Sequence, residues 1–224
     1  MPIAMVENVN SAIQTPTKLN ELLKNVGLTR RLPINPALND LKAADFAAAQ
    51  ESIRVFEKVL ATCETESIDP WKTENLMSMT FSELGLKYSD DFTSTLGEGD
   101  VVEGYSFDNL QIFRNLRFME ICGYDIFDIL TTDWMTLFER SQKITTAILE
   151  RCETVMTTGQ TISLEDLPVH YMKERMSLQK QVNKVKFRSL GPIFAKAGTP
   201  AGVLVACHAE IIDESPERHE LRFI

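Results

Sequence analysis

Cys207 and His208 are adjacent in the sequence, and both residue types bind metal ions or take part in catalysis. They lie in an apolar run, residues 200–209, whose composition is typical of a β-strand. Neighbouring residues of a strand point to opposite faces of its sheet, so one metal ion could not be held by both side chains. We therefore predict no metal site here.

The other cysteines, Cys63, Cys122 and Cys152, are spread along the chain without a C-x-x-C pair. Isolated thiols of this kind are most often free and buried. The sequence also lacks G-x-S-x-G, the phosphate-binding P-loop, H-E-x-x-H and the dinucleotide-binding fingerprint. Acidic pairs at residues 90–91 and 165–166 lie in polar surroundings, as expected for solvated surface. We therefore expect no catalytic residues.

Composition indicates an ordinary soluble globular protein: 224 residues, 44% apolar and 25% charged. No apolar run approaches the roughly 20 residues of a membrane helix. The first ten residues have neither a basic region nor an apolar segment of the kind found in signal peptides. We therefore expect a cytoplasmic protein without membrane contact.

Negative charge is concentrated in the first half of the chain. Residues 1–112 carry a net charge of −8, and residues 113–224 a net charge of −1. An acidic half argues against wrapping nucleic acid, because phosphate binding needs a basic surface.

A short basic segment keeps contact with an acidic partner surface possible. Its residues are Lys173, Arg175, Lys180, Lys184, Lys186 and Arg188. The last three alternate with Val185, Phe187 and Ser189, a pattern that also fits a half-buried strand of a solvent-facing sheet.

Helices are predicted in the N-terminal region, residues 15–90, after a loosely ordered arm at residues 1–14. Gly27 is expected to end the first helix. The third helix is expected to begin near Asp69 and Pro70 and to end at Gly85. The polar, acidic residues 87–100 are expected to be a linker.

The second predicted helix, residues 36–63, is long and amphipathic, and it needs a partner surface to cover its apolar face. That surface is either the rest of the chain or a second copy. For a homodimer, the contact candidates are Leu41, Phe46, Ile53, Phe56 and Leu60.

From residue 101 the pattern changes to one or two strands, several short helices, a helix over residues 141–159, and further strands. Grouped helices between strand runs indicate an α+β fold with an antiparallel sheet. Two glycines and a proline in residues 195–202 predict a hairpin between the last two strands. Residues 213–224 are expected to be a tail.

A series of residues follows the order of a known family pattern: Asn115, Phe118, Gly123, Tyr124, Asp125, Asp133 and Trp134, then Pro192, Gly198 and Gly202 in the final hairpin. With these positions, residues 101–212 resemble a PAS domain. The cysteine of flavin-binding light sensors is replaced by Leu116, so adduct photochemistry is not expected. Residues 165–181 exceed a simple hairpin and are expected to hold an extra helix at residues 173–180.

The resemblance implies a PAS-like antiparallel sheet with flanking helices and a small-molecule pocket, preceded by the α-helical region. Its pocket candidates are Phe118, Tyr124, Trp134, Phe187 and His208. His170 or His208 would be the axial ligand if haem were bound, but no second diagnostic residue supports haem. The sequence therefore leaves the cofactor unknown.

The leading hypothesis is a cytoplasmic regulatory protein that signals through ligand or partner binding and forms a homodimer. One alternative is a transcription regulator that binds DNA through the N-terminal helices, with Arg30 and Arg31 between them. A second alternative is a small-molecule enzyme, which would need an acid–base pair facing a PAS-like cavity.

Overall fold

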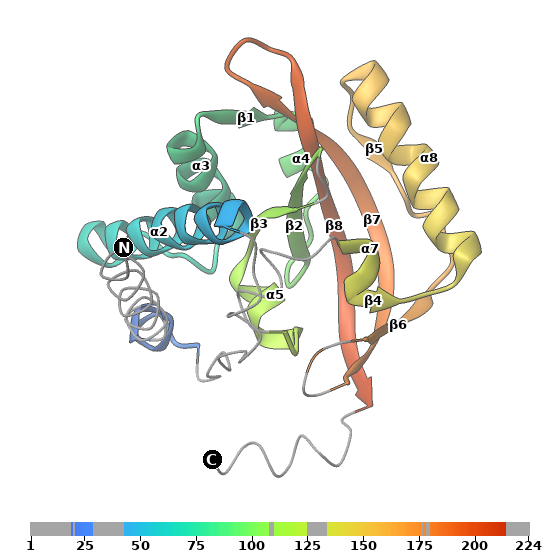
Figure 1. Cartoon of the computed structure of the whole chain (residues 1–224), viewed down its shortest axis with the longest axis horizontal. Helices are drawn as coiled ribbons and strands as arrows, with labels where there is room; N and C mark the ends of the chain where they lie inside the picture. The colour runs from blue at the N-terminus through green and yellow to red at the C-terminus, as the bar shows by residue number, and fades with distance from the viewer. Residues whose placement is uncertain are drawn as a thin grey trace.

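An antiparallel sheet forms the centre of the computed structural model (Figure 1). The structure describes residues 19, 21–28, 43–107, 110–124, 134–175, 177 and 180–213, without the side chains of residues 43–50, 134, 136 and 213. The strands of this part are β1 (Leu86–Tyr88), β2 (Val101–Ser106), β3 (Gln111–Arg114), β4 (Phe138–Glu139), β5 (Ile162–Ser163), β6 (His170–Glu174), β7 (Val182–Ala195) and β8 (Pro200–Asp213). The helices are α2 (Ala43–Glu66), α3 (Thr73–Leu84), α4 (Asp90–Thr93), α5 (Leu116–Ile121), α7 (Trp134–Leu137) and α8 (Gln142–Thr158).

The strand order is β3-β2-β8-β7-β6-β4, with β1 and β5 also paired to β7, and every pair is antiparallel. The long strands β7 and β8 are joined by the predicted hairpin. In its turn Gly198 has φ +83°, a left-handed conformation that glycine adopts without steric cost. The predicted α+β class and final hairpin are therefore confirmed.

Alternation along the strands gives the sheet two covered faces, because successive residues point to opposite sides. On β8, Val205 and Cys207 belong to a core beneath α8, whereas Leu204 and Ala206 belong to a second core beneath α2 and α3. Figure 1 shows α8 on one side of the sheet and α2 and α3 on the other. We call the α8 side the inner face and the other side the outer face.

Helix α2 finds its partner surface within the chain. Ile53, Phe56 and Leu60, proposed for a dimer contact, are buried in the outer core. That core also contains residues of α3 and of β2, β3, β7 and β8. The described part of the apolar face of α2 is thus covered by the chain itself. Of the two remaining dimer candidates, Leu41 lies outside the described residues, and the side chain of Phe46 is not described.

Glycines end the helices where the sequence predicts. Gly27, Gly85 and Gly159 have φ of +90°, +68° and +66°. The start of α3 is corrected, however, to Thr73. Asp69 instead accepts a hydrogen bond from the backbone N–H of Trp71 at 3.0 Å in the turn before the helix.

Residues 87–100, predicted to be a linker, are part of the folded body. Strand β1 pairs with β7, and α4 places Phe92 in the outer core with no exposed surface. A Cβ atom on Gly191 of β7 would lie only 2.6 Å from the Phe92 ring. Glycine at residue 191 therefore allows this segment to lie directly on the sheet.

The helix predicted at residues 173–180 is also wrong, because Lys173 and Glu174 belong to β6. Along β6 buried residues alternate with exposed ones, the two-residue period of a strand. On β7, Lys184, Lys186 and Arg188 point to one face of the sheet, as predicted. Ser189 does not point to the face of Val185 and Phe187, because an irregularity between Phe187 and Ser189 turns it to the outer face, opposite Ala206. No helix in the described part of the chain is long and apolar enough to cross a membrane.

Candidate functional site

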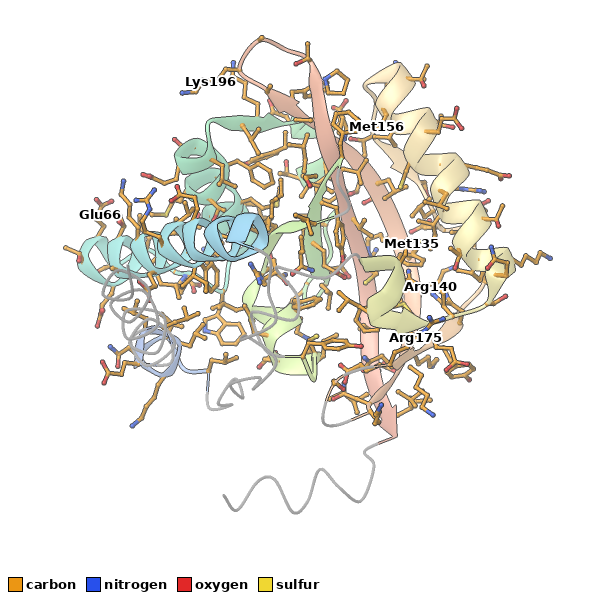
Figure 2. All side chains as sticks on the ribbon, in the orientation of Figure 1. Glu66, Met135, Arg140, Met156, Arg175 and Lys196 are labelled. Atoms are coloured by element: carbon orange, nitrogen blue, oxygen red, sulfur yellow. The ribbon has the colours of Figure 1, made fainter. Side chains whose placement is uncertain are left out.

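A cavity of about 130 Å³ lies beneath α8, on the inner face of the sheet. In Figure 2 the labelled residues Arg140 and Met156 lie between β8 and α8, separated along the length of the helix. The lining residues are Glu103, Tyr105, Ser106, Phe107, Phe138, Arg140, Ile148, Leu149, Cys152, Met156, Met172, Phe187, Gly202, Val203, Val205 and Cys207.

One wall of the cavity is polar and comes from β2. Glu103 and Tyr105 are two residues apart, so both point to the inner face. A register shift between Gly104 and Tyr105 places Gln111 of β3 opposite Tyr105. The Tyr105 hydroxyl donates to the Glu103 carboxylate, and the side-chain amide of Gln111 donates to the same oxygen at 3.0 Å. These contacts form a hydrogen-bonded cluster beside the cavity.

Arg140 follows β4 and extends this polar wall. Its guanidinium carbon lies 5.8 Å from the ring centre of Phe138, a cation–π distance. Burial lowers the pKa of Arg140, and negative charge on Glu103 opposes that change. Burial likewise raises the pKa of Glu103. The wall therefore combines a guanidinium with a carboxyl group that is more easily protonated than usual.

The opposite wall is the apolar face of α8. Ile148, Leu149, Cys152 and Met156 fall at helical spacing, so they line one side of the helix. Burial raises the pKa of the Cys152 thiol to about 11, which keeps it protonated near neutral pH. The thiol therefore acts as an apolar group here, and it is a poor nucleophile.

Two of the predicted pocket residues border inner-face cavities. Phe187 lines the main cavity. Phe118 lines a second cavity of about 20 Å³, and the two cavities share Glu103, Phe138, Met172 and Cys207 as lining residues. Each cavity is therefore lined by one of the predicted pocket residues.

Two other predicted pocket residues have different surroundings. Tyr124 is fully buried; its hydroxyl donates to the carbonyl of Leu137 and accepts from the backbone N–H of Arg175 at 2.9 Å. This bonding gives Tyr124 a structural role between α7 and β6. Trp134 is the first residue of α7, and its side chain is not described.

The two histidines considered for haem lie on opposite faces of the sheet. His208 is 47% exposed on the outer face, 3.3 Å from Glu210, so it does not line the cavity as predicted. Cys207 and His208 are thus split between the faces, as the strand pattern requires. His170 is buried on the inner face, stacked on Phe187 with ring centres 5.0 Å apart, and burial lowers its pKa.

The basic residues proposed to contact a partner have different surroundings in the structure. Arg188 pairs at 2.8 Å with the buried carboxylate of Asp100, and Lys186 donates to the backbone carbonyls of Glu165 and Leu167. Lys184 lies 3.7 Å from Glu210 on the outer face. Lys173 and Arg175 are exposed on and after β6. Among the described residues, Lys186 and Arg188 thus make contacts within the fold.

The polar wall was missed from the sequence. Glu103, Tyr105 and Arg140 line the cavity, and Gln111 supports it, yet no motif marks them. A usable signal was the two-residue spacing of Glu103 and Tyr105, which places two polar side chains on the buried face of a strand. No group of three or more potential metal ligands occurs in the described part of the structure.

Some of the solved structures that are similar to this chain contain a PAS domain. No protein-family model and no curated protein matches the chain. Among solved structures, the PAS domain of a protein from Colwellia psychrerythraea is 12% identical, with a TM-score of 0.38, and the match covers 50% of this chain and 86% of that chain. A sensory box sensor histidine kinase from Vibrio cholerae is 15% identical, with a TM-score of 0.33 and coverage of 62% and 99%.

A third solved structure, Drosophila melanogaster Cycle PAS-B with bound glycerol, is 13% identical, with a TM-score of 0.35 and coverage of 50% and 99%. The chain itself has an antiparallel sheet with α8 across one face, in agreement with the α+β class that the sequence predicts.

Proposed function

We propose that this chain is a sensory, regulatory module that binds a small molecule in the cavity beneath α8. The observation that carries the proposal is the pairing of an apolar wall on α8 with a polar wall at Glu103, Tyr105 and Arg140. Protein interiors rarely leave space larger than a water molecule, and a pocket with a few convergent polar groups is typical of ligand sites.

The size of the cavity limits the ligand. About 130 Å³ is close to the roughly 150 Å³ of an engineered apolar cavity that takes up benzene. We propose a ligand of about one ring or a short chain. Haem and flavin are much larger than this space, so neither is part of the proposal.

Ligand binding in the cavity would change the packing of the N-terminal helices α2 and α3. Arg114 of β3 is the register partner of Glu103, and its guanidinium carbon lies 5.8 Å from the ring centre of Phe56 on α2. Asn115 donates to Thr73 of α3 at 2.9 Å. Strands β2 and β3 therefore carry the polar wall on the inner face and hold α2 and α3 on the outer face.

Binding is favoured over catalysis at this site. The enzyme alternative needs an acid–base pair, and Glu103 with Tyr105 meets that requirement only in part. Burial and the neighbouring carboxylate raise the pKa of Tyr105 well above its usual value, which makes the phenolate base inaccessible near neutral pH. Cys152 is equally unsuited as a nucleophile.

We propose that the chain forms a homodimer through the outer face of β6 to β8 rather than through α2. Tyr171 and Ile212 are exposed there, beside Lys184 and Glu210. A two-fold contact requires a self-complementary surface, and this face carries charges of both signs. Light scattering would show a dimer that Tyr171→Glu converts to monomer; a monomer at high concentration contradicts the dimer.

Native mass spectrometry of the purified chain tests the binding function. We expect excess mass that disappears on denaturation, or uptake of added small aromatic molecules. Cys152→Phe places a ring in the cavity and should abolish both, whereas the matched control Cys152→Ser removes only the thiol and should retain them. Binding unchanged in Cys152→Phe would place any ligand elsewhere.

A further inference from the structure

If the main cavity binds a small molecule, as proposed above, the second cavity on the inner face extends the range of ligands that the site can take. The second cavity measures about 20 Å³, enough for about one water-sized group. Four side chains, from β2, β4, β6 and β8, line both cavities: Glu103, Phe138, Met172 and Cys207. These four side chains lie between the two spaces, and we call them the divider.

The second cavity is mainly apolar. Six of its lining residues are buried apolar ones: Val101, Phe118, Ile121, Cys122, Val185 and Ala209. Its polar lining residues are Glu103 and Asn183, and the amide oxygen of Asn183 accepts a hydrogen bond of 2.6 Å from Gln181. An apolar group would therefore fit this space better than a polar one, which would lose its hydrogen bonds to water.

Three members of the divider are held in place. The carboxylate of Glu103 accepts a hydrogen bond from the Tyr105 hydroxyl. The ring of Phe138 packs edge-on against Tyr124, with ring centres 5.6 Å apart. Cys207 has a short side chain on β8, which lies between β2 and β7 in the sheet. A movement of any of these three would disturb a contact or a central strand.

Met172 is the member of the divider that can move most easily. Its side chain is unbranched, with three rotatable bonds, so methionine adapts to irregular spaces. It lies on β6, and in the described part of the sheet only the two-residue strand β4 follows β6 in the strand order. A change from one staggered rotamer to another leaves the backbone in place. Such a change would make the volume of both cavities available to one ligand.

We propose that Met172 is a movable divider, and that the second cavity accepts the apolar end of an unbranched, medium-chain molecule with one polar group. In the position described here, Met172 limits the ligand to about one ring or a short chain. After its side chain turns, the same site holds a longer chain, with the polar group at the wall formed by Glu103 and Tyr105.

Titration calorimetry of the full chain with 1-butanol, 1-hexanol and 1-octanol tests this ligand class. Each methylene that becomes buried should tighten binding about fourfold, so 1-octanol should bind at least about tenfold more tightly than 1-hexanol. Ala209→Val places methyl groups in the second cavity and should remove most of that gain, while 1-butanol binds as before. The matched control Ala201→Val makes the same change on β8 at a residue packed against the outer core, and should keep the gain.

Substitutions of Met172 test the divider itself. Met172→Ile keeps an apolar side chain but introduces a branch at Cβ that restricts its rotamers. This variant should lose the gain for 1-octanol and still bind 1-butanol. Met172→Ala shortens the divider, so it should bind 1-octanol at least as tightly as the unmodified chain does.

The outcomes separate the second cavity from the binding function. If 1-octanol binds the unmodified chain no more tightly than 1-hexanol, or if its gain survives both Ala209→Val and Met172→Ile, the role of the second cavity is overturned while binding in the main cavity stands. Binding of 1-octanol that is unchanged in Cys152→Phe overturns it as well. If none of the alcohols binds the unmodified chain, both proposals fail. Circular dichroism establishes that each variant is folded, and Met172→Ile serves if Ala209→Val is not.

Discussion

The side-chain amide of Asn115 donates a hydrogen bond of 2.9 Å to the hydroxyl of Thr73, and another of 2.8 Å to the carbonyl of Asp100. Its oxygen accepts from the backbone N–H groups of Val102 and Phe118. Asn115 is buried, and it thus caps α5 and forms hydrogen bonds with β2 and with the first residue of α3.

Asn115→Ala should lower the free energy of unfolding by about 3 kcal/mol, because it removes a helix cap and leaves a buried backbone N–H of β2 without a partner. Thr73→Ala, which removes one of these bonds, should cost about 1 kcal/mol. Urea unfolding measures both. No loss in Thr73→Ala would show that Asn115 does not join the N-terminal helices to the sheet, and equal losses in the two variants would show that its bonds to α5 and β2 add nothing.

Gly191→Ala should destabilise the chain by about 2 kcal/mol or more, since the added Cβ meets the Phe92 ring. Phe92→Ala leaves a cavity and should cost about 3 kcal/mol. In the double variant the alanine methyl lies in vacated space, so the total loss should be smaller than the sum. Strict additivity would mean that α4 does not pack on β7 in solution.

Cys152 should react slowly with thiol reagents. Its pKa of about 11, against an ordinary value near 9, lowers the thiolate fraction at pH 8 by about a hundredfold. The rate should rise steadily as pH increases from 8 to 10. Mass spectrometry identifies the labelled residue, and the rate of free cysteine is the reference. A rate that levels off below pH 9 contradicts a raised pKa.

Ligand binding in the cavity should stabilise α2 as well as α8. When benzyl alcohol fills the cavity, we expect slower amide hydrogen exchange in α2 as well as in α8, because Arg114 joins the polar wall to Phe56. Phe56→Leu keeps an apolar side chain but removes the ring, and should weaken the effect in α2 alone. Protection confined to α8 would leave the N-terminal helices without a role in the response.

Local sequence patterns predict the ends of several helices and the final hairpin. Gly159 and Gly198 mark a helix end and a hairpin turn because positive φ favours glycine, and both positions follow the pattern. Strand β6 was misread because its charged exposed residues, such as Lys173, resemble those of a helix over so short a stretch.

The candidate site depends on relationships between distant residues. Whether Phe56 faces a second copy or the chain's own sheet is decided by tertiary packing, which periodicity along α2 does not contain. The polar wall requires the β2–β3 register that sets Gln111 opposite Tyr105. Arg140, after β4, reaches the wall only through the fold.

Methyl resonances of the methionines test the central claim, ligand binding beneath α8, most directly. Met156 and Met172 line the cavity, whereas Met77 is buried in the outer core between α3 and the sheet. On titration with benzyl alcohol, the account predicts saturable shifts that are largest at Met156 and Met172, small at Met77, and absent in Cys152→Phe. Shifts of equal size at all three methionines, or none at Met156 and Met172, would contradict it.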